Sequence, residues 1–225
     1  MHNEPVAVAE VDRAEVGMVE PCCGAPTGSR ASERRRRVAE AARMLFAEHG
    51  FHGAGMAQIA TQSGVKVGQI YRDFASKEHI VAAIVEGDLN AYLDESLLHA
   101  AINRGDAPAI RGWIRDLVER KAHPQESPLL PEILAESGRN DRISAILRCI
   151  DARVRACVLA ALGALSSLPL DTPRLGASAD LVMTVMMGLC SRQIAGLDAD
   201  SAGLAARVQQ MIERELNALA AEPAA

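Results

Sequence analysis

Aromatic side chains are scarce in this sequence of 225 residues, which contains one Trp, two Tyr and three Phe. Uninterrupted apolar runs of roughly 18 residues are lacking as well, and this excludes an ordinary membrane-spanning helix. Residues 1–20 are acidic and have no basic start followed by an apolar stretch, so they are not typical of a secretory signal. These absences predict a cytoplasmic protein that has no membrane partner.

Catalytic and metal-binding motifs are also lacking. The histidines are scattered without the HExxH spacing of a zinc protease, and the sequence has neither a glycine-rich phosphate loop nor a nucleophile elbow. Cys149 and Cys157 would lie roughly 12 Å apart on one helix, too far to bond each other, so Cys149, Cys157 and Cys190 are interpreted as small buried hydrophobic residues. We therefore expect no enzyme, no metal site and no cofactor.

Hydrophobic residues make up 49% of the chain, and most of them are aliphatic. This composition favours helices packed by Ala and Leu side chains and predicts an all-α fold. The net charge of −5 argues against nucleic acid, but its distribution does not. Between residues 30 and 80, nine basic and five acidic side chains leave a net charge of +4, so the remainder carries −9. A basic segment on an acidic body indicates a protein that contacts phosphate with one end.

Two short helical patterns stand at the centre of the basic segment. Met56, Ile59 and Ala60 form the apolar stripe of the first pattern, which Gly64 ends because glycine accepts the left-handed backbone of a helix C-terminus. The second pattern repeats at i, i+3, i+4 and i+7, with Val67, Ile70, Tyr71 and Phe74. Each helix has about two turns and is too short to be stable alone in water, so the pair predicts a braced helix-turn-helix.

Basic residues flank this pair on both sides. A helix capped by Ser32 and running to about His49 carries Arg34 to Arg37 in its first turns, where one or two of them are expected to face a DNA backbone. A solvated charge run is the alternative interpretation. Ser76 is the predicted N-cap of the fourth helix, and Lys77 at its start can bind a phosphate together with the helix N–H groups.

Several pieces within residues 45–78 resemble the DNA-binding domain of TetR-family transcriptional regulators of the TetR/AcrR type. They are LFAEHGF at 45–51, Ile59-Ala60, Gly64-Val65, GQIYRDF at 68–74 and Ser76-Lys77-Glu78. The resemblance implies a three-helix DNA-binding domain, a C-terminal helical domain that binds a small effector, and a homodimer paired through its last two helices. It also implies a palindromic operator on double-stranded DNA.

The predicted DNA contacts follow from the resemblance and from side-chain chemistry. They are Arg34, Arg35, Arg36, Gly55, Met56, Lys66, Val67, Gln69, Tyr71, Arg72 and Lys77. Gly55 stands where the family usually has a hydroxyl, so a phosphate contact there comes from backbone N–H groups. Val67 can meet a thymine methyl and Gln69 an adenine edge, whereas Tyr71 has either a phosphate contact or a purely structural role. The departures at Gly55, Lys66 and Val67 bear on the operator sequence rather than on docking.

The predicted organisation has about nine helices. A disordered tail covers 1–29, the helix-turn-helix DNA-binding domain 30–78, and a ligand-binding and dimerisation domain 79–225, in which a continuous fourth helix reaches about Asn103. The candidate ligand-binding residues are Tyr92, Trp113, Ile133, Cys149, Met183 and Met187, with an ordinary core role as the alternative for each.

The leading hypothesis is a repressor that a small lipophilic effector releases from its operator, and family habit favours control of an efflux pump and multidrug resistance. One alternative is a helical interaction protein that has lost DNA binding. Another is a redox-sensing or soft-metal-sensing regulator that uses Cys22 and Cys23 in the tail.

Overall fold

The computed structural model describes residues 29–119, 129–197 and 201–222, which form helices joined by short loops and contain no strand. The expected all-α class is therefore confirmed for these residues. The predicted disordered tail, including Cys22 and Cys23, lies almost wholly outside them. The helices are α1 (Ser29–Gly53), α2 (Met56–Ser63), α3 (Val67–Asp73), α4 (Lys77–Leu93), α5 (Glu95–Asn103), α6 (Ala107–Glu119), α7 (Leu129–Ser137), α8 (Asp141–Leu165), α9 (Pro173–Ile194) and α10 (Ser201–Ala221).

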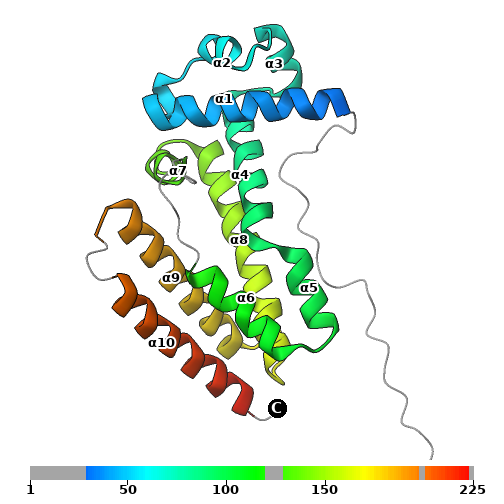
Figure 1. Cartoon of the computed structure of the whole chain (residues 1–225), viewed down its shortest axis with the longest axis vertical. Helices are drawn as coiled ribbons and strands as arrows, with labels where there is room; N and C mark the ends of the chain where they lie inside the picture. Colours follow the sequence, from blue (N-terminus) through cyan, green and yellow to red (C-terminus); the bar gives the residue numbers. More distant parts are fainter. Residues whose placement is uncertain (1–28, 120–128, 198–200, 223–225) are drawn as a thin grey trace, which may run out of the picture.

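The helices form a small N-terminal group mounted on a longer body (Figure 1). Helix α1 lies across one end of the molecule, with α2 and α3 on its outer side. Helices α4 and α8 run away from α1 into the body, where α5 and α6 pack against α8. Helices α9 and α10 lie side by side along one edge of the body, where they contact α8. The outer face of α2 and α3 is therefore the end farthest from the α9–α10 pair.

Helix α1 begins and ends differently from its prediction. It starts at Ser29, so the expected N-cap Ser32 lies inside the helix, and it continues past His49 to Gly53. The predicted break is present at Gly50 as a kink between two helical pieces, because Gly50 has φ 72° and ψ 170°, a conformation that only glycine adopts readily. The helix resumes with a hydrogen bond from the Ala54 N–H to the Gly50 carbonyl oxygen.

The fourth helix is not continuous to Asn103 as predicted. Asp94 has φ 42°, in the left-handed region, and splits the segment into α4 and α5, so the described residues form ten helices where about nine were expected. The Asp94 carboxylate accepts the Leu97 N–H and so caps α5, while the Trp113 indole N–H donates to the Leu93 carbonyl oxygen at 2.7 Å. An Asp side chain tolerates this backbone conformation because it can bond locally, so no Gly or Pro marks the break.

Two hydrophobic clusters hold the described residues together. The N-terminal cluster includes Val38, Phe46, Ile59, Ile70, Phe74, Ile80 and Ile84, joined by Leu129, Ile133 and Ile143 from α7 and α8. The second cluster lies in the body and includes Leu93, Trp113, Val158, Leu162, Leu175 and Leu216. Because the first cluster extends into α7 and α8, the core of the helix-turn-helix is continuous with the body rather than closed at residue 78.

Candidate nucleic-acid interface

The turn between α2 and α3 has the predicted chemistry. Gly64 ends α2 with φ 65° and donates its N–H to the carbonyl oxygens of Ala60 and Thr61. Val65 is buried beneath the turn, and Lys66 with an extended backbone begins α3. Ile59 and Ile70, one from each helix, are fully buried against α1. The glycine bend and these anchors hold α3 close to α1.

The opposite face of α3 is open to solvent. Lys66, Gly68 and Arg72 are exposed, Val67 and Tyr71 keep 38% and 52% of their surfaces accessible, and Gln69 is half-buried. An exposed Tyr and Val beside two basic residues are uncommon on a solvated helix but suit a helix that enters a groove. The five predicted contact residues on and next to α3 therefore share one accessible surface.

The start of α2 lies beside this surface. Gly55 is exposed at the N-cap position and its N–H donates to the Gln58 side-chain oxygen at 2.6 Å, while Met56 is half-buried. Nothing but the Gln58 amide stands within 4 Å of the space that a Gly55 side chain would occupy. A helix N-terminus with open space in front of it can approach an anion closely.

Arg34 and Arg35, predicted to face DNA, contact the C-terminal end of α3. The Arg34 guanidinium forms a bidentate pair with the Asp73 carboxylate, at 2.5 and 2.8 Å, and Arg35 donates to the Asp73 carbonyl oxygen at 2.5 Å. The Arg35 guanidinium also lies 4.2 Å from the centre of the Phe74 ring. Hydrogen bonding to Arg34 lowers the pKa of Asp73 below its usual value. Arg36 instead pairs with Glu33 on the exposed side of α1.

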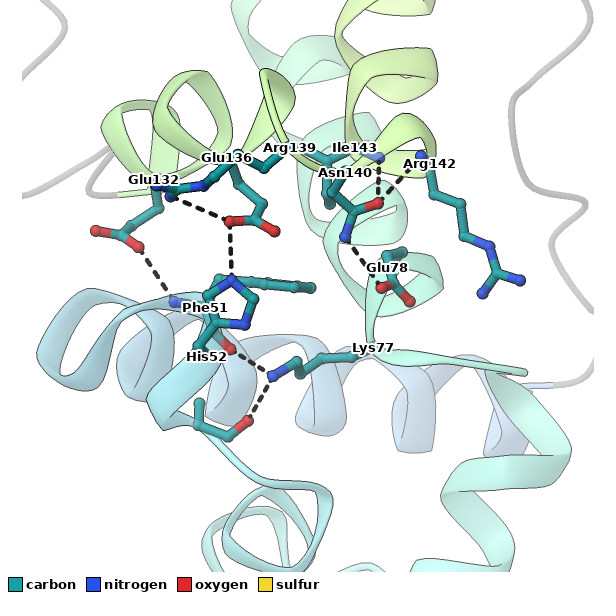
Figure 2. A network of polar contacts seen from close by, with 11 residues as sticks. Phe51, His52, Lys77, Glu78, Glu132, Glu136, Arg139, Asn140, Arg142 and Ile143 are labelled. Atoms are coloured by element: carbon teal, nitrogen blue, oxygen red, sulfur yellow. Dashed lines mark hydrogen bonds and ion pairs between the residues drawn. The ribbon is translucent and has the colours of Figure 1, made fainter.

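Lys77 connects the kinked end of α1 to the start of α4. Its ammonium donates to the carbonyl oxygens of Phe51 and Ala54 and lies 4.3 Å from the centre of the Phe51 ring. Burial lowers the pKa of Lys77 below its usual value. Figure 2 shows the side chain reaching across to the α1 end. Lys77 therefore satisfies backbone carbonyls that the end of the helix leaves without partners.

Helix α7 contacts the same end of α1 from the other side (Figure 2). Glu132 accepts the Phe51 backbone N–H at 3.1 Å, and the His52 ring Nε2 lies 3.0 Å from a carboxylate oxygen of Glu136. The Glu136 side chain is only 7% exposed and also pairs with Arg139. The N-terminal group of α1, α2 and α3 is thus joined to the body through α7 as well as through α4.

Asn140 extends this junction to α8. Its side-chain oxygen caps α8 by accepting the N–H groups of Arg142 and Ile143, and its amide nitrogen donates to Glu78 at the start of α4. Sequence reasoning did not find Glu132, Glu136 or Asn140 because their partners lie 62 to 84 residues away in the chain. No local pattern marks such pairs.

The predicted ligand-binding residues do not all come together. Tyr92, Trp113 and Met183 belong to or pack against the body cluster, where the Tyr92 hydroxyl donates to the Leu117 carbonyl oxygen at 2.8 Å. Ile133 lies in the N-terminal cluster, Cys149 is half-buried on α8, and Met187 is exposed on α9. The first three residues share one region, and the other three lie apart from it.

Within the described residues, no group of three or more His, Cys, Asp or Glu side chains is placed to hold a metal ion. In the same part of the chain, none of the helices has the length and apolar character needed to span a membrane.

Residues 38–84 match the family model described as bacterial regulatory proteins, tetR family. The chain is 32% identical over 126 residues to the HTH-type transcriptional regulator UidR of Escherichia coli K12, in a match that covers 52% of this chain and 59% of UidR. It is 34% identical over 65 residues to a Staphylococcus aureus HTH-type regulator, covering 29% of this chain and 35% of that protein. These matches span little more than half of the relatives' length, or less.

Solved structures share the fold over most of the chain. Salmonella enterica GusR superposes with a TM-score of 0.62 at 24% identity, covering 83% of this chain and 96% of GusR. A TetR transcription regulator from Haloarcula marismortui gives a TM-score of 0.63 at 19% identity, covering 84% and 98%. The likeness in fold therefore includes the body as well as the helix-turn-helix.

Proposed function

We propose, from the match of residues 38–84 to the tetR family of bacterial regulatory proteins, that this chain is a regulator of that family. In this proposal it represses transcription by binding a palindromic operator, from which a small lipophilic effector releases it. The observation that carries this proposal is the exposed face of α3, where Lys66, Val67, Tyr71 and Arg72 stand together above a buried anchor. In the proposed complex α3 enters the major groove of double-stranded DNA.

Each exposed residue has a contact that suits its chemistry. Val67 packs against a thymine methyl, the Gln69 amide pairs with an adenine edge, and Arg72 binds guanine or a phosphate. The Tyr71 hydroxyl and the Lys66 ammonium bind the backbone at the edges of the groove.

Phosphate contacts on either side hold the helix-turn-helix in place. The Met56 backbone N–H faces a phosphate at the start of α2, and the Gly55 N–H joins it when its hydrogen bond to the Gln58 side chain opens. The three basic residues next to α3 and α4 already donate hydrogen bonds within the protein: Arg34, Arg35 and Lys77. A guanidinium has five N–H donors and an ammonium has three, so each of these side chains can also contact a phosphate. Arg36 joins them when its exposed pair with Glu33 opens, because such pairs contribute little in water.

The test is binding to a duplex taken from the region upstream of the coding sequence. We expect a saturable complex by fluorescence anisotropy, with an affinity that falls steeply as salt rises. Tyr71→Phe removes one hydroxyl and Arg72→Ala one cation, and each should weaken binding by about tenfold. Arg115→Ala is the matched control, because Arg115 is exposed on α6 in the body. A chain that forms no saturable complex at low salt would instead be a helical interaction protein.

A second copy of the chain is the proposed partner of α9 and α10. These helices carry exposed large apolar side chains: Leu181 and Met187 on α9, and Leu204 and Met211 on α10. In the family the last two helices pair with their copies, and an apolar surface of this kind is stable in water when a partner covers it. We expect a dimer by multi-angle light scattering, and a shift to monomer in Met187→Asp with Leu204→Asp. A wild-type monomer at micromolar concentration would contradict this assignment.

We place the effector site in the body, in the region around Tyr92, Trp113 and Met183. The proposed division is a DNA-binding domain at residues 30–78 and a ligand-binding and dimerisation domain at 79–225. Binding there would move α4 and α7, the two helices that hold the kinked end of α1, and so change the spacing of the two α3 helices in the dimer. The test is a panel of lipophilic compounds scored for release of the bound duplex. Release by thiol oxidants alone, lost when Cys22 and Cys23 are changed to Ser, would favour a redox-sensing regulator.

A further inference from the structure

We propose that Asp73 is a positioning residue for the recognition helix, because it holds both Arg34 and Arg35 of α1 and so sets the orientation of α3 in the DNA groove. This inference rests on the proposed function as a DNA-binding regulator. In this inference, two of the arginines that were predicted to bind phosphate hold Asp73 at the end of α3.

Helix α3 needs such an anchor because its hydrophobic attachment is small. It has seven residues, of which Ile70 alone is fully buried, and Phe74 follows at its C-terminal end. Two apolar anchors about one turn apart resist separation of α3 from α1 but leave the helix able to rotate about the line that joins them. A polar contact with a defined direction removes that freedom.

Asp73 supplies a contact of this kind through two groups at once. Its carboxylate receives the bidentate Arg34 pair, and its backbone carbonyl oxygen receives Arg35. The carbonyl belongs to the last turn of α3, where no helical N–H remains to bond it and a cation is favourable. Arg35 also covers the Phe74 ring, and the Asp73 side chain is only 9% exposed. Planar bidentate pairs are directional, so the two arginines fix the rotation of α3.

Asp73 is either a positioning residue or an ordinary solvated acid, and its negative charge lets an experiment distinguish these two roles. A carboxylate on a helix that approaches phosphates repels them, so removing a purely solvated acid should strengthen DNA binding. Removing a positioning acid should weaken it, because α3 loses its orientation. The sign of the change therefore decides between the two roles.

Asp73→Asn is the decisive variant, and Glu48→Gln is its matched control. Glu48 is an acid on α1 whose side chain is 73% exposed and makes only a 3.9 Å contact with His49. Binding is measured by fluorescence anisotropy with the upstream duplex and with a random-sequence duplex, each over a salt series. We expect Asp73→Asn to weaken binding to the upstream duplex by about tenfold, while random-sequence binding stays at the wild-type level or becomes tighter because one negative charge is lost. Glu48→Gln should bind both duplexes as tightly as wild type or more tightly.

Arg34→Lys supplies a second test that keeps the charge. Lysine cannot form the bidentate pair, so specific binding should fall while the salt dependence is unchanged. In the double variant with Asp73→Asn, the loss should be no larger than in either single variant, because both remove the same contact. Thermal unfolding of each variant identifies any that lose the fold, and Arg34→Lys then decides.

The outcomes separate the inference from the function on which it rests. If wild type does not bind the upstream duplex saturably, the proposed function fails. If wild type binds and Asp73→Asn binds equally or more tightly, or if the two variants add fully, Asp73 does not position α3 and the inference is overturned.

Discussion

The kink in α1 depends on Gly50, and replacing this residue with alanine should destabilise the protein. With φ 72° and ψ 170°, Gly50 occupies a region that is essentially closed to other residues, at a cost of about 1–3 kcal/mol. An added Cβ would also stand 3.2 Å from the Glu132 Oε2 atom. That same oxygen accepts the Phe51 N–H, so moving it weakens a hydrogen bond worth about 1 kcal/mol.

The unfolded chain works in the opposite direction, because alanine restricts it and favours folding by about 0.4–1 kcal/mol. We therefore expect Gly50→Ala to lower the free energy of unfolding by about 1–3 kcal/mol in urea titrations followed by circular dichroism. The matched control is Gly87→Ala. Gly87 is exposed within α4 and nothing lies within 4 Å of an added Cβ, so this change should stabilise the protein by about 0.5–1 kcal/mol.

A double variant separates the two parts of the effect. In a Glu132→Ala background the close contact and the hydrogen bond are already gone, so Gly50→Ala should cost only its backbone part. A Gly50→Ala protein as stable as wild type, or stabilised like Gly87→Ala, would refute the reasoning about the kink.

The remaining predictions concern pH, thiol reactivity and the α4–α5 break. Hydrogen bonding to Arg34 lowers the pKa of Asp73 in the folded protein. The ionised carboxylate therefore stabilises the fold above the unfolded pKa of about 4, and this stabilisation is lost as pH falls through the lower pKa of the folded state. The urea midpoint should fall more steeply over this acid range for wild type than for Asp73→Asn, and equal slopes would contradict the prediction. Burial and the neighbouring Glu95 raise the pKa of the Cys157 thiol to about 12. Iodoacetamide at about pH 8 should therefore leave Cys157 unlabelled in the native protein and label it in urea, which peptide mass spectrometry can show. Labelling of the native protein as fast as in urea would contradict this prediction. Asp94→Ala should cost about 1–2 kcal/mol, since it removes the α5 cap from a left-handed residue, whereas Asp94→Asn should be nearly neutral; equal urea midpoints for the two variants would count against the cap.

The sequence predicted the elements of the fold where the signal is local. The apolar spacing of Met56 to Phe74 with Gly64 between its halves is enough to place α2, the turn and α3, because side-chain period and glycine conformation act over a few residues. The same spacing predicted the buried anchors Ile70 and Phe74, but it also placed Val67 and Tyr71 in the apolar stripe, and the structure exposes both. The helix positions and the buried anchors require no knowledge of distant partners.

Contacts between distant segments could not be predicted in this way. Arg34 stands in a run of arginines that resembles a solvated charge patch, and nothing near it in the chain indicates a partner 39 residues away. Lys77 was expected to face a phosphate, but the kinked end of α1 brings two carbonyl oxygens to it. The break at Asp94 escaped prediction for a related reason, because the Trp113 indole that satisfies Leu93 comes from another helix.

That indole contact gives the protein a built-in optical reporter. Trp113 is the only tryptophan in the chain, it is 5% exposed, and its N–H is bonded at the point where α4 gives way to α5. Its fluorescence emission therefore arises from one place, the far end of the helix that begins at Lys77. Any compound that shifts α4 against α6 changes the polarity around this single ring, so effector binding can be followed in unlabelled protein without DNA present.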